Sequence, residues 1–97
     1  MRIEKKAKGE KLTIALEGRL DTNTAPDLEA AMTLEGVKEL VFDIAGLEYI
    51  SSAGLRVLMT AQKAMNAAGG AMSVANANAV VRGVFDITGL SGIFTLV

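Results

Sequence analysis

The sequence contains no cysteine and no histidine. Without cysteine the chain has no disulfide, no thiol nucleophile and no thiolate ligand for a metal, and without histidine it has no imidazole to act as a base or a ligand. A serine nucleophile would need a lysine as its base, and Lys63 is about three helical turns from the serine pair at residues 51 and 52. We therefore expect no enzymatic activity, no metal and no other cofactor.

The sequence also lacks an excess of charge and a long apolar run. Ten Lys and Arg face eleven Asp and Glu, for a formal net charge of -1, whereas proteins that bind nucleic acid are usually basic. No apolar run approaches the roughly 18 residues that a membrane span requires. The first residues are charged and precede no apolar segment of a signal peptide. We expect a cytoplasmic protein that binds neither nucleic acid nor a membrane.

The length predicts one small α/β domain over residues 1–97. Pro26 is the only proline and there is no linker-like tract, so glycines are the main signals for the ends of helices and strands. Residues 12–16 alternate between apolar and other side chains, which indicates a strand with one face on a core. Residues 2–8 predict a charged edge strand that pairs with it through a turn at Gly9.

The middle of the chain predicts a helix and a central strand. Residues 21–26 form a loop rich in capping residues, so we expect a helix that has Pro26 in its first turn and ends near Gly36. Residues 40–44 are almost all apolar, as in a strand covered on both faces. Asp43 is the exception, and we expect it at the strand's end.

The second half predicts two more helices, each followed by a strand. The helix after Ser52 has a buried stripe and ends at Gly69, with Met59 near its polar and exposed side. A strand at 72–75 and a last strand at 93–97 flank a third helix that ends at Gly89, with a buried stripe formed by Val80, Val81, Val84 and Phe85. Alternating strands and helices favour a mixed, mostly parallel sheet of about five strands with helices packed mainly on one face.

Ser51 and Ser52 lie where the central strand meets the following helix. The free N–H groups and the dipole of a helix N-terminus can hold a phosphate or another anion. The simpler alternative is ordinary capping, in which a serine oxygen accepts a hydrogen bond from a backbone N–H of the first turn. The residues alone leave both interpretations open.

Four segments together resemble a STAS domain of the bacterial anti-sigma-factor antagonists. They are GRLD at 18–21, DIAGLEYISSAGL at 43–55, the glycine pair at 69–70 and FDITGL at 85–90. They occur in the family's order and span essentially the whole chain. Ser52 matches the family's phosphorylated serine, Ser51 stands where the family usually has aspartate, and Asp21 matches an acidic residue beside the acceptor.

The resemblance implies a partner-switching regulator that is phosphorylated on Ser52, with Ser51 as the alternative acceptor. The unphosphorylated protein would bind an anti-sigma factor that is also a serine kinase, phosphorylation would release it, and a serine phosphatase would reset the switch. The alternative is a STAS interaction subunit of a transporter or sensory complex that is not phosphorylated. The residues expected at the partner-binding surface are Asp21, Thr22, Ser51, Ser52, Ala53, Gly54, Arg56 and Met59.

Overall fold

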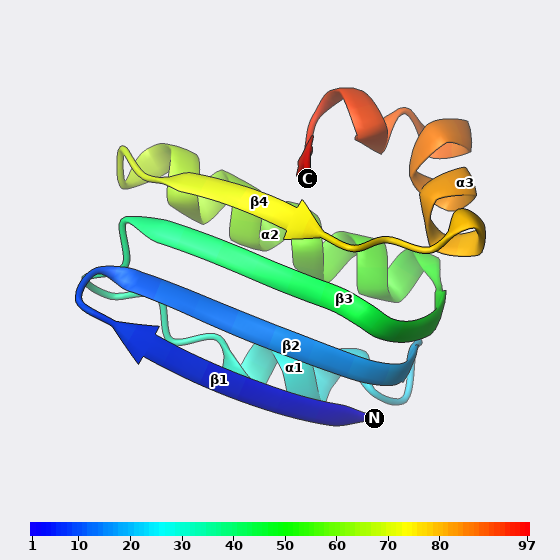
Figure 1. Cartoon of the computed structure of the whole chain (residues 1–97), viewed down its shortest axis with the longest axis horizontal. Coiled ribbons are helices and arrows are strands. Elements are labelled where there is room, and N and C mark those ends of the chain that lie inside the picture. Colours follow the sequence, from blue (N-terminus) through cyan, green and yellow to red (C-terminus); the bar gives the residue numbers. More distant parts are fainter.

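The computed structural model describes residues 1–97 as a five-stranded sheet with three α-helices and one short 3-10 helix (Figure 1). The strands lie in the order β1-β2-β3-β4-β5; β1 is antiparallel to β2 and all other pairs are parallel. This confirms the predicted fold class. The elements are β1 (Arg2–Lys8), β2 (Lys11–Leu20), α1 (Ala25–Ala31), β3 (Glu39–Ile50), α2 (Ser52–Ala67), β4 (Ala71–Ala75), α3 (Ala79–Thr88), η1 (Leu90–Gly92) and β5 (Thr95–Leu96).

The core lies between one face of the sheet and the helices. Helices α1 and α2 lie behind the sheet in Figure 1, and alternate side chains of β2, β3 and β4 are buried on that side. Val41 and Asp43 point to the other face and are only half-buried, so the prediction that this strand is covered on both faces is wrong. Because α1 and α2 both lie behind the sheet, neither of them covers its second face. None of the helices is long and apolar enough to cross a membrane.

Strand β3 is longer and less regular than its sequence predicted. Its pairing with β2 shifts register twice, between Ala15 and Glu17 and between Gly18 and Arg19 of β2. The shifts place two consecutive β3 residues outward each time, so Ile44, Leu47 and Ile50 are buried at a spacing of three instead of two. Asp43 therefore lies within the strand and not at its end.

Helix α3 covers the part of β3 that β4 does not reach. Strand β4 pairs with β3 only as far as Asp43, and in Figure 1 α3 lies beyond the arrowhead of β4. Asn78 caps α3, because its Oδ1 accepts a hydrogen bond from Val81 N at 2.9 Å. Its Nδ2 donates to Leu47 O at 2.9 Å. One side chain thus starts the helix and binds a carbonyl of β3.

Four other expectations are corrected by the structure. Helix α1 ends at Ala31 and not near Gly36, because Met32 is extended and packs partly against the core. The last strand contains only Thr95 and Leu96, because residues 90–92 form a 3-10 helix before it. Val80 is 62% exposed and outside the buried stripe of α3. Met59 is half-buried against the core and not exposed.

Two helical glycines differ sharply in their surroundings. A Cβ on Gly54, in the first turn of α2, would lie 2.6 Å from Leu20 Cγ and 3.0 Å from Ile50 Cγ1. A Cβ on Gly83, within α3, would meet no atom within 4 Å. The first turn of α2 therefore approaches β2 and β3 more closely than any other residue type permits.

We expect Gly54→Ala to lower the free energy of unfolding by about 1–3 kcal/mol, because the new methyl group overpacks the core. Gly83→Ala is the matched control and should raise it by about 0.5–1 kcal/mol, since alanine favours a helix over glycine. Urea unfolding of both variants beside the wild type measures the difference. Equal effects of the same sign would show that the close approach at Gly54 has no energetic importance.

Candidate functional site

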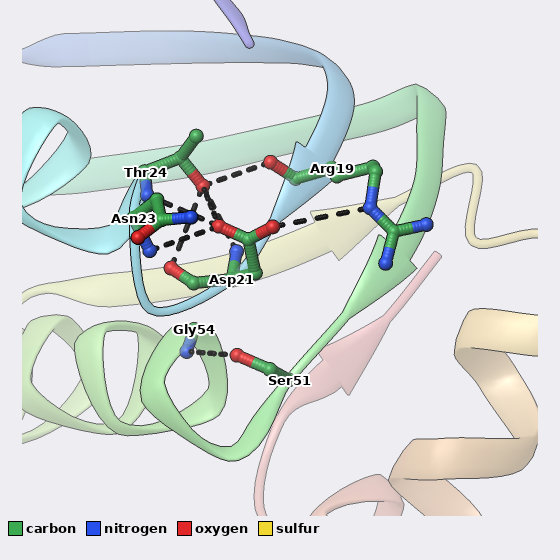
Figure 2. Close-up of polar contacts among 6 residues, drawn as sticks. All are labelled: Arg19, Asp21, Asn23, Thr24, Ser51 and Gly54. Atoms are coloured by element: carbon green, nitrogen blue, oxygen red, sulfur yellow. Dashed lines mark hydrogen bonds and ion pairs between the residues drawn. The ribbon is translucent and has the colours of Figure 1, made fainter.

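The candidate site lies where β2 and β3 end. Because these strands are parallel, the loop after each strand emerges at the same edge of the sheet. The backbone N of Ser51 donates to Leu20 O at 2.9 Å, which ties the two loops together. Figure 2 shows the loop that contains Asp21 next to the turn formed by Ser51 and Gly54. The structure thus brings the Asp21 loop and the serine pair to one edge of the sheet.

The Asp21 carboxylate is folded back into its own loop. Its Oδ1 accepts hydrogen bonds from the backbone N of Asn23 at 3.0 Å and of Thr24 at 3.2 Å, and the Thr24 hydroxyl lies 3.2 Å away (Figure 2). The Thr24 hydroxyl also accepts from Asp21 N at 2.9 Å and lies 2.8 Å from Arg19 O. These contacts fix the loop between β2 and α1, so Asp21 has a structural role at the site's edge.

The electrostatics of Asp21 favour its ionised form. Partial burial acts to raise the pKa of this carboxyl, but the hydrogen bonds from Thr24 and Asn23 and the positive charge of Arg19 outweigh it and lower the pKa. Arg19 Nε lies 3.9 Å from Asp21 Oδ2. Asp21 therefore stays negatively charged at neutral pH.

Arg19 and Tyr49 complete this edge, and sequence reasoning missed both. The two residues are paired neighbours on β2 and β3, and the Arg19 guanidinium carbon lies 4.4 Å from the centre of the Tyr49 ring. Arg19 thus sits between an aromatic ring and the carboxylate of Asp21. A single sequence gave no signal for this contact, because it depends on the register after the β3 irregularities.

The two serines differ in their contacts. Ser51 is the N-cap of α2: it is half-buried, and its Oγ lies 3.4 Å from Gly54 N, from which it accepts a hydrogen bond (Figure 2). Ser52 is the first residue of α2, is exposed, and its hydroxyl makes no hydrogen bond within the protein. The capping interpretation therefore applies to Ser51, whereas the Ser52 hydroxyl is free.

A shallow groove of about 210 Å³ lies between α1 and α2 beside these loops. Thr22, Ala53 and Arg56 line it, which unites three of the residues predicted to bind a partner. Gly54 is buried on the core side of the first turn of α2, and Met59 lies outside the groove. Gly54 can therefore shape this surface but presents nothing to a partner.

A larger hollow of about 580 Å³ lies at the opposite ends of the strands. Lys11, Glu39 and Ala71, the first residues of β2, β3 and β4, are among its lining residues. Lys11 Nζ and Glu39 Oε2 lie 3.7 Å apart there. Because parallel strands place their two ends at opposite edges, this hollow is separate from the serine pair.

The chain matches one family along almost its whole length. A family model described as "Mlab, STAS domain" matches residues 3–97. BtrV of Bordetella bronchiseptica, assigned as an anti-sigma factor antagonist, is 35% identical over 86 residues, which cover 86% of this chain and 74% of that protein. An anti-sigma F factor antagonist of Paenibacillus polymyxa is 29% identical over 83 residues, which cover 81% of this chain and 71% of that protein.

A solved structure shares the fold. The anti-sigma factor antagonist SpoIIAA in its unphosphorylated form superimposes with a TM-score of 0.86 at 20% identity, covering 99% of this chain and 88% of that one. The chain therefore belongs to the STAS domain family.

The lowered pKa of Asp21 predicts a dependence of stability on pH. A carboxyl with a lowered folded-state pKa stabilises the fold above its unfolded pKa of about 3.9, and this stabilisation is lost as the pH falls through the folded pKa. Asp21→Asn should lower the free energy of unfolding at pH 7, and the difference from wild type should shrink below about pH 4. Urea unfolding at a series of pH values measures it.

Glu35→Gln is the matched control, because Glu35 is exposed and forms no ion pair. This variant should follow the wild type at each pH. A deficit of Asp21→Asn that stayed constant into acid would contradict the role of the ionised carboxylate.

Proposed function

We propose that this protein is an anti-sigma factor antagonist that switches partners through phosphorylation of Ser52. The observation that carries the proposal is the difference between the two serines: Ser51 is engaged as a helix cap, while Ser52 presents a free and exposed hydroxyl beside a groove. The relatives that are anti-sigma factor antagonists support the same function. The different contacts of the two serines favour Ser52 over Ser51 as the acceptor.

In the proposed reaction a kinase partner supplies both ATP and the catalytic base. The Ser52 oxygen bonds to the γ-phosphorus of ATP, the bond from that phosphorus to the β-phosphate bridging oxygen breaks, and ADP leaves. The hydroxyl proton passes to a carboxylate base of the partner, as in protein kinases. A serine phosphatase returns the hydroxyl by hydrolysis. The chain is then a substrate and ligand of enzymes in the cytoplasm and catalyses nothing itself.

The effect of phosphorylation on binding follows from its charge. A phosphoserine carries about -1.5 to -2 charges at pH 7. At Ser52 this charge would appear next to the loop of ionised Asp21 and at the edge of the groove lined by Thr22 and Ala53. A partner surface that fits the uncharged hydroxyl would then meet an added dianion, whose desolvation is costly. Phosphorylation therefore releases the anti-sigma factor.

The proposal predicts different partner recovery for variants at Ser52. In pull-downs from extracts of the source cells, wild type and Ser52→Ala should recover an ATP-binding anti-sigma factor, and Ser52→Asp should lose most of it because of its added negative charge. Mass spectrometry of the wild type should find phosphate on Ser52. Ser51→Ala is the control: it should lose about 1 kcal/mol of stability as a missing cap and still be phosphorylated on Ser52.

Equal recovery of the same partner by all variants, without any phosphopeptide, would contradict the switch. The protein would then be a STAS interaction subunit whose binding is indifferent to charge at Ser52. Phosphate on Ser51 alone would contradict the assignment of the acceptor.

A further inference from the structure

We infer that Arg56 is the counter-ion of phosphorylated Ser52, and that phosphorylation withdraws this guanidinium from the partner-facing groove. The inference rests on the proposed phosphorylation of Ser52. It goes beyond that function by naming the side chain of this protein that binds the phosphate. Its basis is the placement of both residues on α2 and the absence of any other partner for Arg56.

Ser52 and Arg56 are four residues apart on α2, and both are exposed. Residues at this spacing are neighbours on a helix surface, with Cβ atoms about 5–6 Å apart. Helical side chains lean toward the N-terminus of the helix, so the Arg56 side chain leans in the direction of the turn that carries Ser52. A negative group N-terminal to a positive one is also the favourable order for this spacing. A phosphate on Ser52 is therefore within reach of the guanidinium.

Arg56 is the one arginine of the protein that has no ion pair. The other three arginines each pair with a carboxylate: Arg2 with Glu4 and Glu17, Arg19 with Asp21, and Arg82 with Asp86. The Arg56 side chain makes no hydrogen bond either, although it lines the groove between α1 and α2. An arginine fork matches phosphate oxygens well and can bind two of them at once.

No other charged group near this edge either offers a free cation to the phosphate or already holds Arg56. Arg19 is held between Asp21 and the Tyr49 ring. Glu29 lines the same groove as Arg56 but forms no ion pair with it. Asp21 is ionised and repels a phosphate. Arg56 is thus the cation that remains available.

The consequence is a switch with two linked effects. In the unphosphorylated protein the Arg56 guanidinium is free to meet an acidic group of the partner at the groove. In the phosphorylated protein the same guanidinium is bound to the phosphate, so the groove gains negative charge and loses its cation at once. The pair also favours the doubly ionised phosphate, because a nearby positive charge lowers its second pKa.

Phosphorus NMR tests the pair directly. Phosphoserine is installed at position 52 of the full chain by genetic encoding, and its second pKa, about 6 in the absence of partners, is measured in wild type, in Arg56→Gln and in Arg56→Lys. We expect the pKa to rise by about 0.2–0.4 unit in Arg56→Gln. Arg56→Lys should give an intermediate value, and added salt should reduce the difference.

Lys63→Gln is the matched control. Lys63 lies on the same helix and is exposed, but the helical rise places it about 16 Å from Ser52. Its removal should leave the phosphate pKa unchanged. A pKa that is equal in wild type and Arg56→Gln, or that rises as much in Lys63→Gln, would overturn the inference.

Because the phosphoserine is installed without a kinase, the experiment tests this inference independently of the proposed function. A raised pKa in Arg56→Gln supports the pair whether or not a cellular kinase is found. Cellular phosphorylation of Ser52 with no change of pKa in Arg56→Gln would overturn the role of Arg56 and leave the proposed function standing.

Discussion

The parallel pairing of β2 with β3 is the constraint on which the rest of the structure depends. It brings the ends of two strands that are thirty residues apart in sequence to one edge, and the hydrogen bond from Ser51 N to Leu20 O fixes their relative position. The Asp21 loop, the start of α2 and the groove between α1 and α2 all follow from that contact. In another register the Asp21 loop and the start of α2 would not lie side by side.

Much of the fold could be predicted from residue patterns, because they report local chemistry. The alternation at residues 12–16 marks a real strand, and Ser51 and the glycines at 69 and 89 lie at or next to real helix ends. The predictions failed where the deciding partner is distant in sequence. The sequence predicted a strand that ends at residue 44, whereas β3 continues to residue 50. The irregular register with β2 that permits this continuation cannot be recognised in one sequence. Val80 belongs to an apolar run, but it lies on the exposed side of α3.

The candidate site was predicted only in part, because some of its contacts join residues that are distant in sequence. Ser51, Ser52 and Asp21 are carried by short motifs, so the sequence indicated them and the resemblance to a family gave them roles. The contact of Arg19 with Tyr49 joins two strands, and the lack of any ion pair at Arg56 can be seen only when all other charges are placed. What a single sequence could not decide was which serine is engaged, since Ser51 and Ser52 are chemically identical.

The contact of Gly54 with Leu20 and Ile50 has a consequence for how a signal leaves this protein. Because the first turn of α2 is seated directly on two core side chains, it has no room to move inward and is tied to Leu20 by Ser51. If Ser52 is phosphorylated as proposed, the first turn beneath it has no room to shift inward, so the change at the surface is a change of charge. A partner would then detect a changed charge on a surface of unchanged shape, so the signal would be electrostatic rather than conformational.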